Sequence, residues 1–394
     1  MKLRLFFLLA ILPILSVLLG IFLLFSLQKR NNNSTQKQTI LPHITTNPSA
    51  NNQTDFPLQS VVAENLEVPW GLVFLPDGSM LITERPGRVR LIDKNSTLKN
   101  QPILTLSVVQ KLQGEGGLLG ITIHPDFEKN RYVYLYYAYE TGGDRTLNRV
   151  ARYTLHGETL TENKIIVDKI PGSLFHDGGR IKFGPDKLLY ITTGDSQNPS
   201  LAQDKNSLAG KILRVTDDGK IPPDNPFGDQ VYSYGHRNPQ GITWDDKGQL
   251  WETEHGRSGA LSGLDELNLI EKGKNYGWPE IQGDEKRAGM VTPVINSGPS
   301  TTWAPAGAAF LPAGRQGYNG SIFFGGLKGA TLYEAVIKGT SVDLKKHFSG
   351  EFGRIRDVVL GPDNMLYITT SNKDGRGTPN AGDDKIIRIN PEKL

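Results

Sequence analysis

The chain repeats one pattern of hydrophobic and polar positions, in which a short alternating strand, a tight turn and a more apolar strand follow one another. In residues 180–195 (RIKFGPDKLLYITTGD), polar and apolar side chains alternate over 180–183, a Gly-Pro-Asp turn follows, and residues 188–193 form the second strand. Period-2 runs bounded by Gly, Pro and Asp are typical of antiparallel strands. The pattern therefore predicts a β-hairpin as the basic unit of the fold.

Six such units occur along the chain, and they are residues 71–83, 120–137, 180–195, 241–256, 307–326 and 357–372. The spacing between them is 49 to 67 residues when equivalent turn positions are taken as Pro76, Pro125, Pro185, Asp245, Pro312 and Pro362. A period of this size, with several short strands and no helix in each unit, is typical of β-propeller blades.

Further strand-like segments lie between the hairpins, for example residues 89–93, 149–154 and 211–215, and they raise the expected number to about four strands per blade. The last strand, 385–390, and the first, 60–66, are free to pair with each other. Such pairing closes the ring and removes exposed sheet edges. We therefore predict an all-β fold, a single six-bladed β-propeller over residues 58–394.

Two N-terminal segments precede the predicted propeller. Residues 1–30 contain Lys2 and Arg4 and then an apolar run from Leu5 to Phe25, which is long enough for a hydrophobic helix that spans a bilayer. We interpret this segment as an uncleaved signal anchor, with a removed signal peptide as the alternative. Residues 31–57, rich in Asn, Thr, Gln and Pro, are predicted to be a flexible, disordered linker. The propeller is thus expected to be exported, and to meet the membrane through the N-terminal segment only.

Charge and composition narrow the class of partner. Lys and Arg total 44 and Asp and Glu total 41, a net charge of +3 that does not indicate binding to nucleic acid. The chain has no cysteine, which excludes disulfides, Cys-ligated zinc and iron–sulfur centres. Any binding site for an anion or a metal must therefore be a local cluster of other residue types.

Polar and aromatic residues precede the first strand of every predicted blade. They are Trp70, Glu115, His176, Arg237 with Asn238, Trp303, and Arg354 with Arg356. In a propeller these positions lie at one mouth of the central channel, so we expect them to converge. Taken singly, a His or Trp beside a Gly-rich turn is more often a packing or capping residue, and Trp70 is compatible with the core. Together with Lys328, however, the arginines predict a site for a flat polyanion, because guanidinium groups bind carboxylates bidentately and stack on rings.

A second group of residues has the chemistry of a calcium site. Asp265 and Glu266 lie beside glycine-rich backbone and supply the hard oxygen ligands that calcium prefers. The alternatives are a solvated turn for this pair and a tight turn with an aromatic plug for NYGWP, residues 275–279. Three other aspartates are interpreted as turn residues: Asp195, Asp217 and Asp218.

Several motifs together resemble the soluble aldose (glucose/sorbosone) dehydrogenase family. They are GEGGLLGITIHPDF, HDGGRIKFGPDKLLYITTGD, LAGKILRV, YGHRNPQGITWD, DELNLIEKGKNYGWP and GRIRDVVLGPD, and the resemblance covers about residues 58–391. It implies a six-bladed propeller that binds pyrroloquinoline quinone (PQQ) and calcium.

The resemblance also implies a role for each matching residue. His176 matches the general base that takes the proton of the C1 hydroxyl group as hydride passes to the quinone, and Arg237 is the second catalytic candidate. The cofactor-binding residues that the resemblance implies are Glu115, His176, Arg237, Asn238, Lys328, Arg354 and Arg356. The convergence of residues at the mouth adds Trp303, because the tryptophans there are expected to sandwich a flat ring. The resemblance implies that the backbone carbonyls of Gly256 and Arg257 hold the calcium of the cofactor, and that Asp265, Glu266 and Tyr276 fall at structural calcium sites.

Two departures from the family pattern affect what the resemblance implies. The segment 257–264 (RSGALSGL) is longer than its counterpart in the family and changes the loop that would shape the calcium shell. Phe175 stands before His176 where glucose-oxidising members carry an aspartate, so the sugar is left open.

The expected activity is therefore PQQ- and calcium-dependent oxidation of an aldose at C1 to a lactone, with electrons passed to an external acceptor. Two alternatives remain: a calcium-dependent propeller lactone hydrolase, which would need carboxylate and amide ligands where this chain is basic, and a non-enzymatic carbohydrate-binding propeller.

Overall fold

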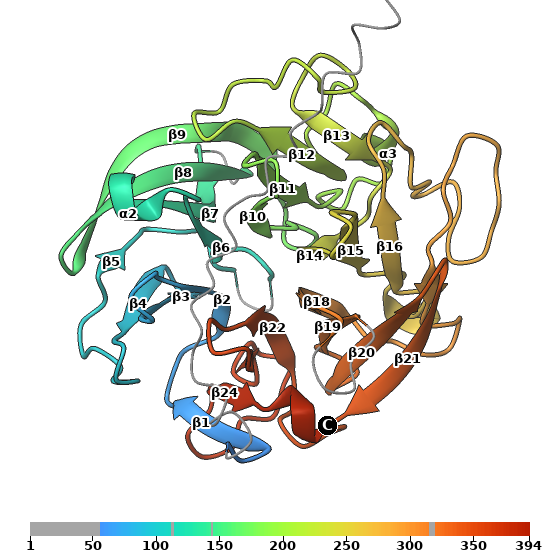
Figure 1. The fold of residues 1–394 in the computed structure, drawn as a ribbon. Helices are drawn as coiled ribbons and strands as arrows, with labels where there is room; N and C mark the ends of the chain where they lie inside the picture. The colour runs from blue at the N-terminus through green and yellow to red at the C-terminus, as the bar shows by residue number, and fades with distance from the viewer. Residues whose placement is uncertain (1–55, 112–113, 143–144, 315–319) are drawn as a thin grey trace, which may run out of the picture. The chain divides into compact units, whose positions relative to one another are not determined.

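In the computed structural model, which describes residues 56–394 except 112–113, 143–144 and 315–319, six four-stranded antiparallel sheets follow one another around a ring (Figure 1). We number these sheets as blades 1 to 6, in the order in which the chain reaches their innermost strands.

From the inside of the ring outward, blade 1 consists of β2 (Pro69–Phe74), β3 (Met80–Glu84), β4 (Arg88–Ile92) and β5 (Leu104–Thr105). Blade 2 consists of β6 (Leu118–Ile123), β7 (Tyr132–Glu140), β8 (Thr146–His156) and β9 (Thr159–Pro171). Blade 3 consists of β10 (Ile181–Phe183), β11 (Leu189–Thr193), β12 (Lys211–Val215) and β13 (Val231–Tyr234). Blade 4 consists of β14 (Pro239–Trp244), β15 (Leu250–Glu254), β16 (Glu266–Ile270) and β17 (Ile295–Asn296). Blade 5 consists of β18 (Pro305–Leu311), β19 (Ser321–Gly326), β20 (Thr331–Lys338) and β21 (Ser341–His347). Blade 6 consists of β22 (Ile355–Leu360), β23 (Leu366–Thr370), β24 (Ile386–Ile389) and β1 (Gln59–Ala63). The helices of the described residues are short: α2 (Phe127–Asn130), α3 (Ser200–Gln203) and the 3-10 turns Gly259–Leu261 and Pro391–Lys393. The predicted six-bladed, four-stranded propeller is confirmed.

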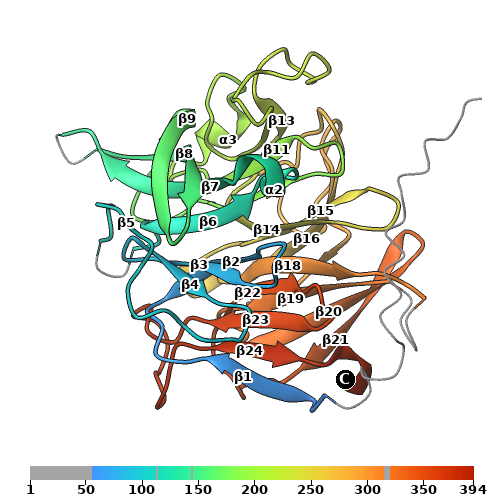
Figure 2. The same cartoon turned by 60° about the vertical axis from the view of Figure 1, so that its left-hand side comes forward.

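The ring closes through the two ends of the propeller domain. β1 pairs antiparallel with β24, with Gln59 opposite Ile389, and so becomes the outermost strand of blade 6 (Figure 2). This pairing was expected from the sequence and leaves no gap between the first and last blades.

The tight turns that join the two inner strands of the blades are stabilised by their own aspartates. Asp77, Asp186 and Asp245 each accept, through Oδ1, a hydrogen bond from the backbone N–H two residues further along. A carboxylate that bonds to nearby backbone in this way favours a turn over a continued strand. The repeated turn residues thus end the inner strands at equivalent points.

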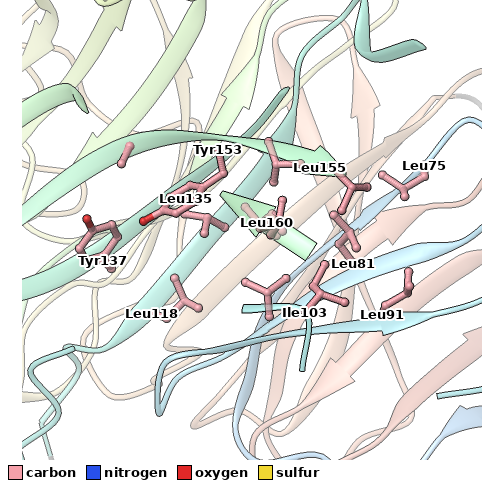
Figure 3. Close-up of a cluster of buried hydrophobic side chains, with 14 of the residues drawn as sticks. Leu75, Leu81, Leu91, Ile103, Leu118, Leu135, Tyr137, Tyr153, Leu155 and Leu160 are labelled. Atoms are coloured by element: carbon pink, nitrogen blue, oxygen red, sulfur yellow. The ribbon is translucent and has the colours of Figure 1, made fainter. Parts of the chain in front are cut away.

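Apolar side chains that alternate along the strands pack between neighbouring blades. Between blades 1 and 2, Leu81 of β3 and Leu135 of β7 are completely buried in one cluster, together with Leu118 and Tyr153 (Figure 3). Burial of one such leucine contributes about 1.5–3 kcal/mol. The blades therefore hold one another in place, and this fixes the loops at both ends of the ring.

The innermost strands line a central channel that has two different ends. The segments that lead into β6, β10 and β14 meet at one end through Glu115, His176 and Asn238, and we call this end the proximal mouth. The turns that follow the innermost strands lie at the other end, the distal mouth, where the ends of β10, β14, β18 and β22 line one cavity. The predicted site residues belong to the proximal mouth.

The predicted signal anchor, residues 1–30, and the linker up to residue 55 lie outside the described residues. Within residues 56–394, apart from the gaps named above, no helix is both long and apolar enough to cross a membrane.

Candidate functional site

A layer of buried side chains crosses the channel beneath the proximal mouth. Arg180 reaches from the start of blade 3 to blade 6, where its Nη1 lies 3.0 Å from Oδ2 of Asp357. The guanidinium groups of Arg180 and Arg356 lie over the ring of Trp70, with Cζ at 4.3 and 5.6 Å from the ring centroid. Gly307 leaves room for this layer, because a Cβ atom there would lie 1.9 Å from Oδ1 of Asp357. Trp70, only 1% exposed, is therefore a packing residue of the channel rather than a ring presented at the mouth.

Glu115 connects the predicted residues of the proximal mouth. Its Oε2 accepts hydrogen bonds from the backbone N–H of His176 (3.0 Å) and from Nδ2 of Asn238 (3.1 Å), and its Oε1 lies 3.2 Å from Nη1 of Arg376. Burial by itself would raise the pKa of Glu115, but the surrounding basic groups, Arg376 among them, and the backbone N–H of His176 outweigh it and lower the pKa to about 2. Glu115 is thus an anion within a basic surrounding.

His176 has a carboxylate partner that the sequence interpretation missed. Nδ1 of His176 lies 2.7 Å from Oδ1 of Asp195, and the other oxygen of Asp195 accepts a hydrogen bond from Nε1 of Trp278 at 2.8 Å. Asp195 also caps a turn, as predicted, by accepting the N–H of Gln197. A carboxylate at Nδ1 selects the tautomer that carries its proton there, which leaves Nε2 as the proton acceptor. The geometry therefore prepares His176 to act as a base.

Arg237 and Asn238 are held from the side of blade 4. Nη1 of Arg237 donates to the carbonyl of His255 (3.2 Å), Nη2 donates to Oγ of Ser258 (2.7 Å), and the guanidinium lies 5.3 Å from the ring centroid of Trp278. Oδ1 of Asn238 accepts the N–H of Gly178 at 3.0 Å. Both side chains are therefore fixed next to His176.

Arg354 and Arg356 enter from blade 6, as predicted. Nε and Nη2 of Arg354 both contact Oδ2 of Asp374, at 2.9 and 2.7 Å, and Nη1 donates to the carbonyl of Leu327. Lys328, the next residue after Leu327, is exposed beside this pair. Burial, with the neighbouring arginines, lowers the pKa of Arg356 to about 9, so Arg356 is still a cation at neutral pH.

A further arginine, Arg85, belongs to the same cluster and was not predicted. It is only 6% exposed, and among the described residues its buried Nε has no hydrogen-bond partner. Burial lowers its pKa, while Asp374 and Glu115 provide the nearest negative charge. His255 was missed as well: burial lowers its pKa to about 3, so it is neutral, and its Nε2 is buried without a partner.

Arg85, Asp195 and His255 share a sequence position that could have identified them. Each lies one or two residues after the second strand of a blade, where β3, β11 and β15 end at Glu84, Thr193 and Glu254. Because that strand runs antiparallel to the innermost one, its end returns to the proximal mouth.

A small cavity brings most of the predicted metal-binding residues together. It has a volume of about 10 Å³ and is lined by Gly256, Arg257, Glu266 and Tyr276, together with Glu254. Burial and the nearby Glu254 raise the pKa of Glu266 to about 8. Two buried carboxylates repel each other when both are charged, and a cation in a cavity of this size would relieve that repulsion.

The remaining predicted residues differ from expectation. The carboxylate of Asp265 is buried and accepts the backbone N–H groups of Gly256 (2.8 Å), Trp303 (2.6 Å) and Ala304 (2.9 Å), so it orders the backbone and does not line the cavity. The ring of Trp303 packs against Phe324 and Tyr333 inside blade 5 and is 4% exposed. It is thus a core residue, and the expected sandwich of the cofactor by two tryptophans is not supported.

The lengthened loop 257–264 and Tyr276 restrict which oxygens face the small cavity. The carbonyl of Arg257 accepts the N–H of Gly263 at 3.3 Å within this loop. The hydroxyl of Tyr276 donates to the carbonyl of Leu269 (2.7 Å) and accepts the N–H of Glu271, so only its backbone is left for a cation.

The fold and site define a class: a six-bladed propeller with a cationic proximal mouth built around a His–Asp pair. The chain belongs to the glucose/sorbosone dehydrogenase family, whose model matches residues 66–387. It is 34% identical to aldose sugar dehydrogenase YliI from Escherichia coli, over 80% of this chain and 90% of that protein. The structure of a PQQ-bound aldose sugar dehydrogenase from Streptomyces coelicolor has a TM-score of 0.75 and 39% identity, and covers 84% of this chain and 98% of its own. Quinoprotein glucose dehydrogenase B from Acinetobacter calcoaceticus is 32% identical over 59% of this chain and 54% of that protein. The chain is therefore a sugar dehydrogenase by family.

Proposed function

We propose that the protein oxidises an aldose at C1 to the lactone, with PQQ and calcium at the proximal mouth and His176 as the base. The observation that carries this proposal is the pair of His176 and the buried Asp195, set at 2.7 Å among fixed arginines. When bound, PQQ would supply the two-electron acceptor for the hydride of the sugar, and an external acceptor would later take the electrons.

The residues of the chain would handle the proton. Nε2 of His176 takes it from the C1 hydroxyl group, because Asp195 holds the other nitrogen and stabilises the imidazolium that forms. Glu115 holds the backbone N–H of His176 and so fixes the position of the ring. General base catalysis of this kind contributes about 10²–10⁴-fold to a rate.

The basic side chains would hold the cofactor. Four buried nitrogen atoms around the mouth have no partner among the described residues: Nε of Arg85, Arg237 and Arg356, and Nε2 of His255. Buried polar groups in native proteins are almost always paired, so this set fits an acceptor-rich ligand. Arg354 and the exposed Lys328 complete a cluster in which cations outnumber carboxylates, as the three carboxylates of PQQ require.

Calcium would lie next to this cluster. Gly256, Arg257, Tyr276, Glu254 and Glu266 line the small cavity, and they would supply its oxygen donors through the backbone carbonyls of the first three and the carboxylates of the last two. Calcium prefers such hard ligands, and its positive charge would favour the arrival of electrons from the sugar on the cofactor.

The sugar would lie against the outer rim. There Arg376 covers the ring of Phe175, with 5.1 Å between its guanidinium and the ring centroid, and lies beside Glu115. An aromatic face and a charged hydrogen-bonding pair suit the apolar face and hydroxyl groups of an aldose.

The two alternatives are supported less well. A lactone hydrolase would need its metal among carboxylates in the channel, but in the described residues the proximal side of the channel is lined by arginines. A non-enzymatic binding propeller would have no need of a base held in one tautomer.

The test is reconstitution of the purified full-length chain with PQQ and calcium chloride, followed by dye reduction with a panel of aldoses. Saturable binding of PQQ and sugar-dependent reduction are expected. No binding of PQQ would contradict the proposal, and binding without turnover on any aldose would favour the binding propeller.

We also propose that the protein acts outside the cytoplasm, on the basis of the apolar run from Leu5 to Phe25. Cell fractionation tests this. An anchor predicts that the protein stays with membranes after alkaline extraction, and removal of the run should release it.

A further inference from the structure

The distal mouth opens into a cavity of about 730 Å³ that shares no residue with the proposed sugar site. The walls come from the ends of β10, β14, β18 and β22 and are largely half-buried apolar side chains: Phe183, Trp244, Phe310, Val359 and Leu360. Binding sites for small molecules usually have volumes of about 300–1,000 Å³ and apolar, aromatic walls. The distal cavity is thus large enough for an organic ligand.

A smaller chamber of about 100 Å³ continues this cavity toward the layer that crosses the channel. All six innermost strands contribute to its wall, which includes Arg180, Lys182 and Asp357. Lys182 and Val359 line both spaces, so the apolar cavity leads inward to a charged end.

The charges at this inner end do not balance. Asp357 is already occupied, because its oxygens accept from Arg180 and from the backbone N–H groups of Leu72 and Val358. The side chain of Lys182, a half-buried residue, has no hydrogen bond or ion pair among the described residues, and Nη2 of Arg180 is buried without a partner. The chamber therefore holds two cations and one carboxylate, and because that carboxylate pairs with Arg180, the charge of Lys182 is left without a partner.

This environment affects Lys182 itself. Burial, reinforced by Arg180 and opposed by Asp357, lowers the pKa of Lys182 to about 8. The ammonium group is therefore mainly charged at pH 7 but lacks an anion. Lys182 is half-buried and lines the open cavity, so a ligand that displaces solvent there would leave its charge unpaired unless the ligand itself is negative.

We propose that the distal mouth binds a small monocarboxylate with an aromatic body, its carboxylate on Lys182 and its ring against Trp244 and the adjoining apolar residues. The positive charge of Lys182 attracts the carboxylate of the ligand, and the apolar walls favour its aromatic ring. The rim selects against a second negative charge, because Asp245 and the exposed Asp246 lie there. This site is independent of PQQ and of the proposed reaction.

The test uses benzoate as the probe and the purified full-length chain. Isothermal titration is carried out on the wild type, on Lys182→Met, on Lys182→Arg and on Lys247→Met, whose lysine lies exposed at the same rim. Loss of a charge-assisted hydrogen bond is expected to weaken binding by roughly 10–100-fold in Lys182→Met. Lys182→Arg and Lys247→Met should retain affinities close to the wild type, and neutral benzamide should bind the wild type as weakly as benzoate binds Lys182→Met.

The arginines of the proximal mouth could also attract benzoate, so the position must be observed directly. Crystals soaked in 4-bromobenzoate should give an anomalous bromine peak in the distal cavity, between Trp244 and Phe310. A peak only at the proximal mouth, equal binding of benzamide and benzoate, or unchanged affinity in Lys182→Met would each overturn the proposal.

Discussion

The two mouths of the channel lie on the same six strands but have opposite chemistry. The proximal mouth is made by loops between blades and by the ends of second strands, and it collects Arg85, Arg237, Arg354 and Arg356 around one His–Asp pair. The distal mouth is made by short turns and collects half-buried apolar residues around Lys182. Loops are free to carry long polar side chains without disturbing the sheet, whereas tight turns are restricted to residues that form them. The difference explains why the same repeat provides a reactive end and an apolar end.

The largest effect is expected at His176. Replacement by Gln keeps the volume of the side chain but removes the base, so turnover should fall by about 10²–10⁴-fold while PQQ affinity changes little. Steady-state dye reduction and a PQQ titration measure the two quantities. His124→Gln, on blade 2, is the matched control and should leave both unchanged. Loss of PQQ affinity along with turnover would show that His176 supports the structure of the mouth.

The layer between the mouths should contribute strongly to stability. Arg180→Met leaves Asp357 buried without its cation, and removal of one partner from a buried ion pair costs about 3–5 kcal/mol. Arg214→Met is the matched control, because Arg214 is as buried as Arg180 (both 7% exposed) but its partners Asp186 and Asp224 are partly exposed. Urea unfolding should show a much smaller loss for the control. Equal losses would mean that the ion pair across the channel has no special role.

Replacement of Arg85 tests whether the proximal mouth is built to bind an anionic ligand. Its Nε is buried without a hydrogen-bond partner among the described residues, so Arg85→Met should weaken PQQ binding by roughly 10–100-fold and, without cofactor, raise the melting temperature. Arg88→Met, in the same blade but paired with Glu67 and Glu84, should leave PQQ affinity unchanged. If the cofactor-free Arg85→Met protein melts below the wild type, this would contradict the interpretation that Arg85 finds its partner only when a ligand is bound.

The propeller itself could be predicted almost completely from the sequence, because its evidence is local. Each hairpin carries its own alternation, several carry a turn aspartate, and the closing pair of β1 and β24 follows from a free strand at each end. The predicted site residues that lead into innermost strands also converge, as the contacts of Glu115 with His176 and Asn238 show.

What the sequence could not provide is the direction of individual side chains. Trp303 and Glu115 both precede an innermost strand, but Trp303 turns into the core of blade 5 while Glu115 faces the mouth. Asp265 appeared suited to calcium because of its chemistry, whereas it accepts hydrogen bonds from three backbone N–H groups and does not line the small cavity. These outcomes depend on contacts between blades, which no short stretch of sequence contains.

Calcium should affect the proximal side only, and in a way that depends on pH. The pKa of Glu266 is raised to about 8, above its unfolded value, so without calcium the folded state keeps a proton that the unfolded state loses. Stability should therefore fall as the pH rises from about 5 to 8. Calcium binds the deprotonated form, so the gain in melting temperature on its addition should grow over the same range. Thermal scans with EGTA and with calcium measure this, and Glu266→Gln should abolish the trend.

The smallest effect, and the sharpest test of the separation between the mouths, is expected from Lys182→Met on turnover. Lys182 lies beyond the layer formed by Trp70 and Arg180, and it touches none of the residues assigned to the cofactor or the sugar. We therefore expect dye reduction to stay within about twofold of the wild type, because the charges that interact with Lys182 are Asp357 and Arg180 of the crossing layer and none of the residues assigned to the reaction. Assays with and without benzoate extend the test. A change in turnover that needs both benzoate and Lys182 would show that the crossing layer transmits the occupancy of one mouth to the other, and the two ends would then be coupled rather than separate.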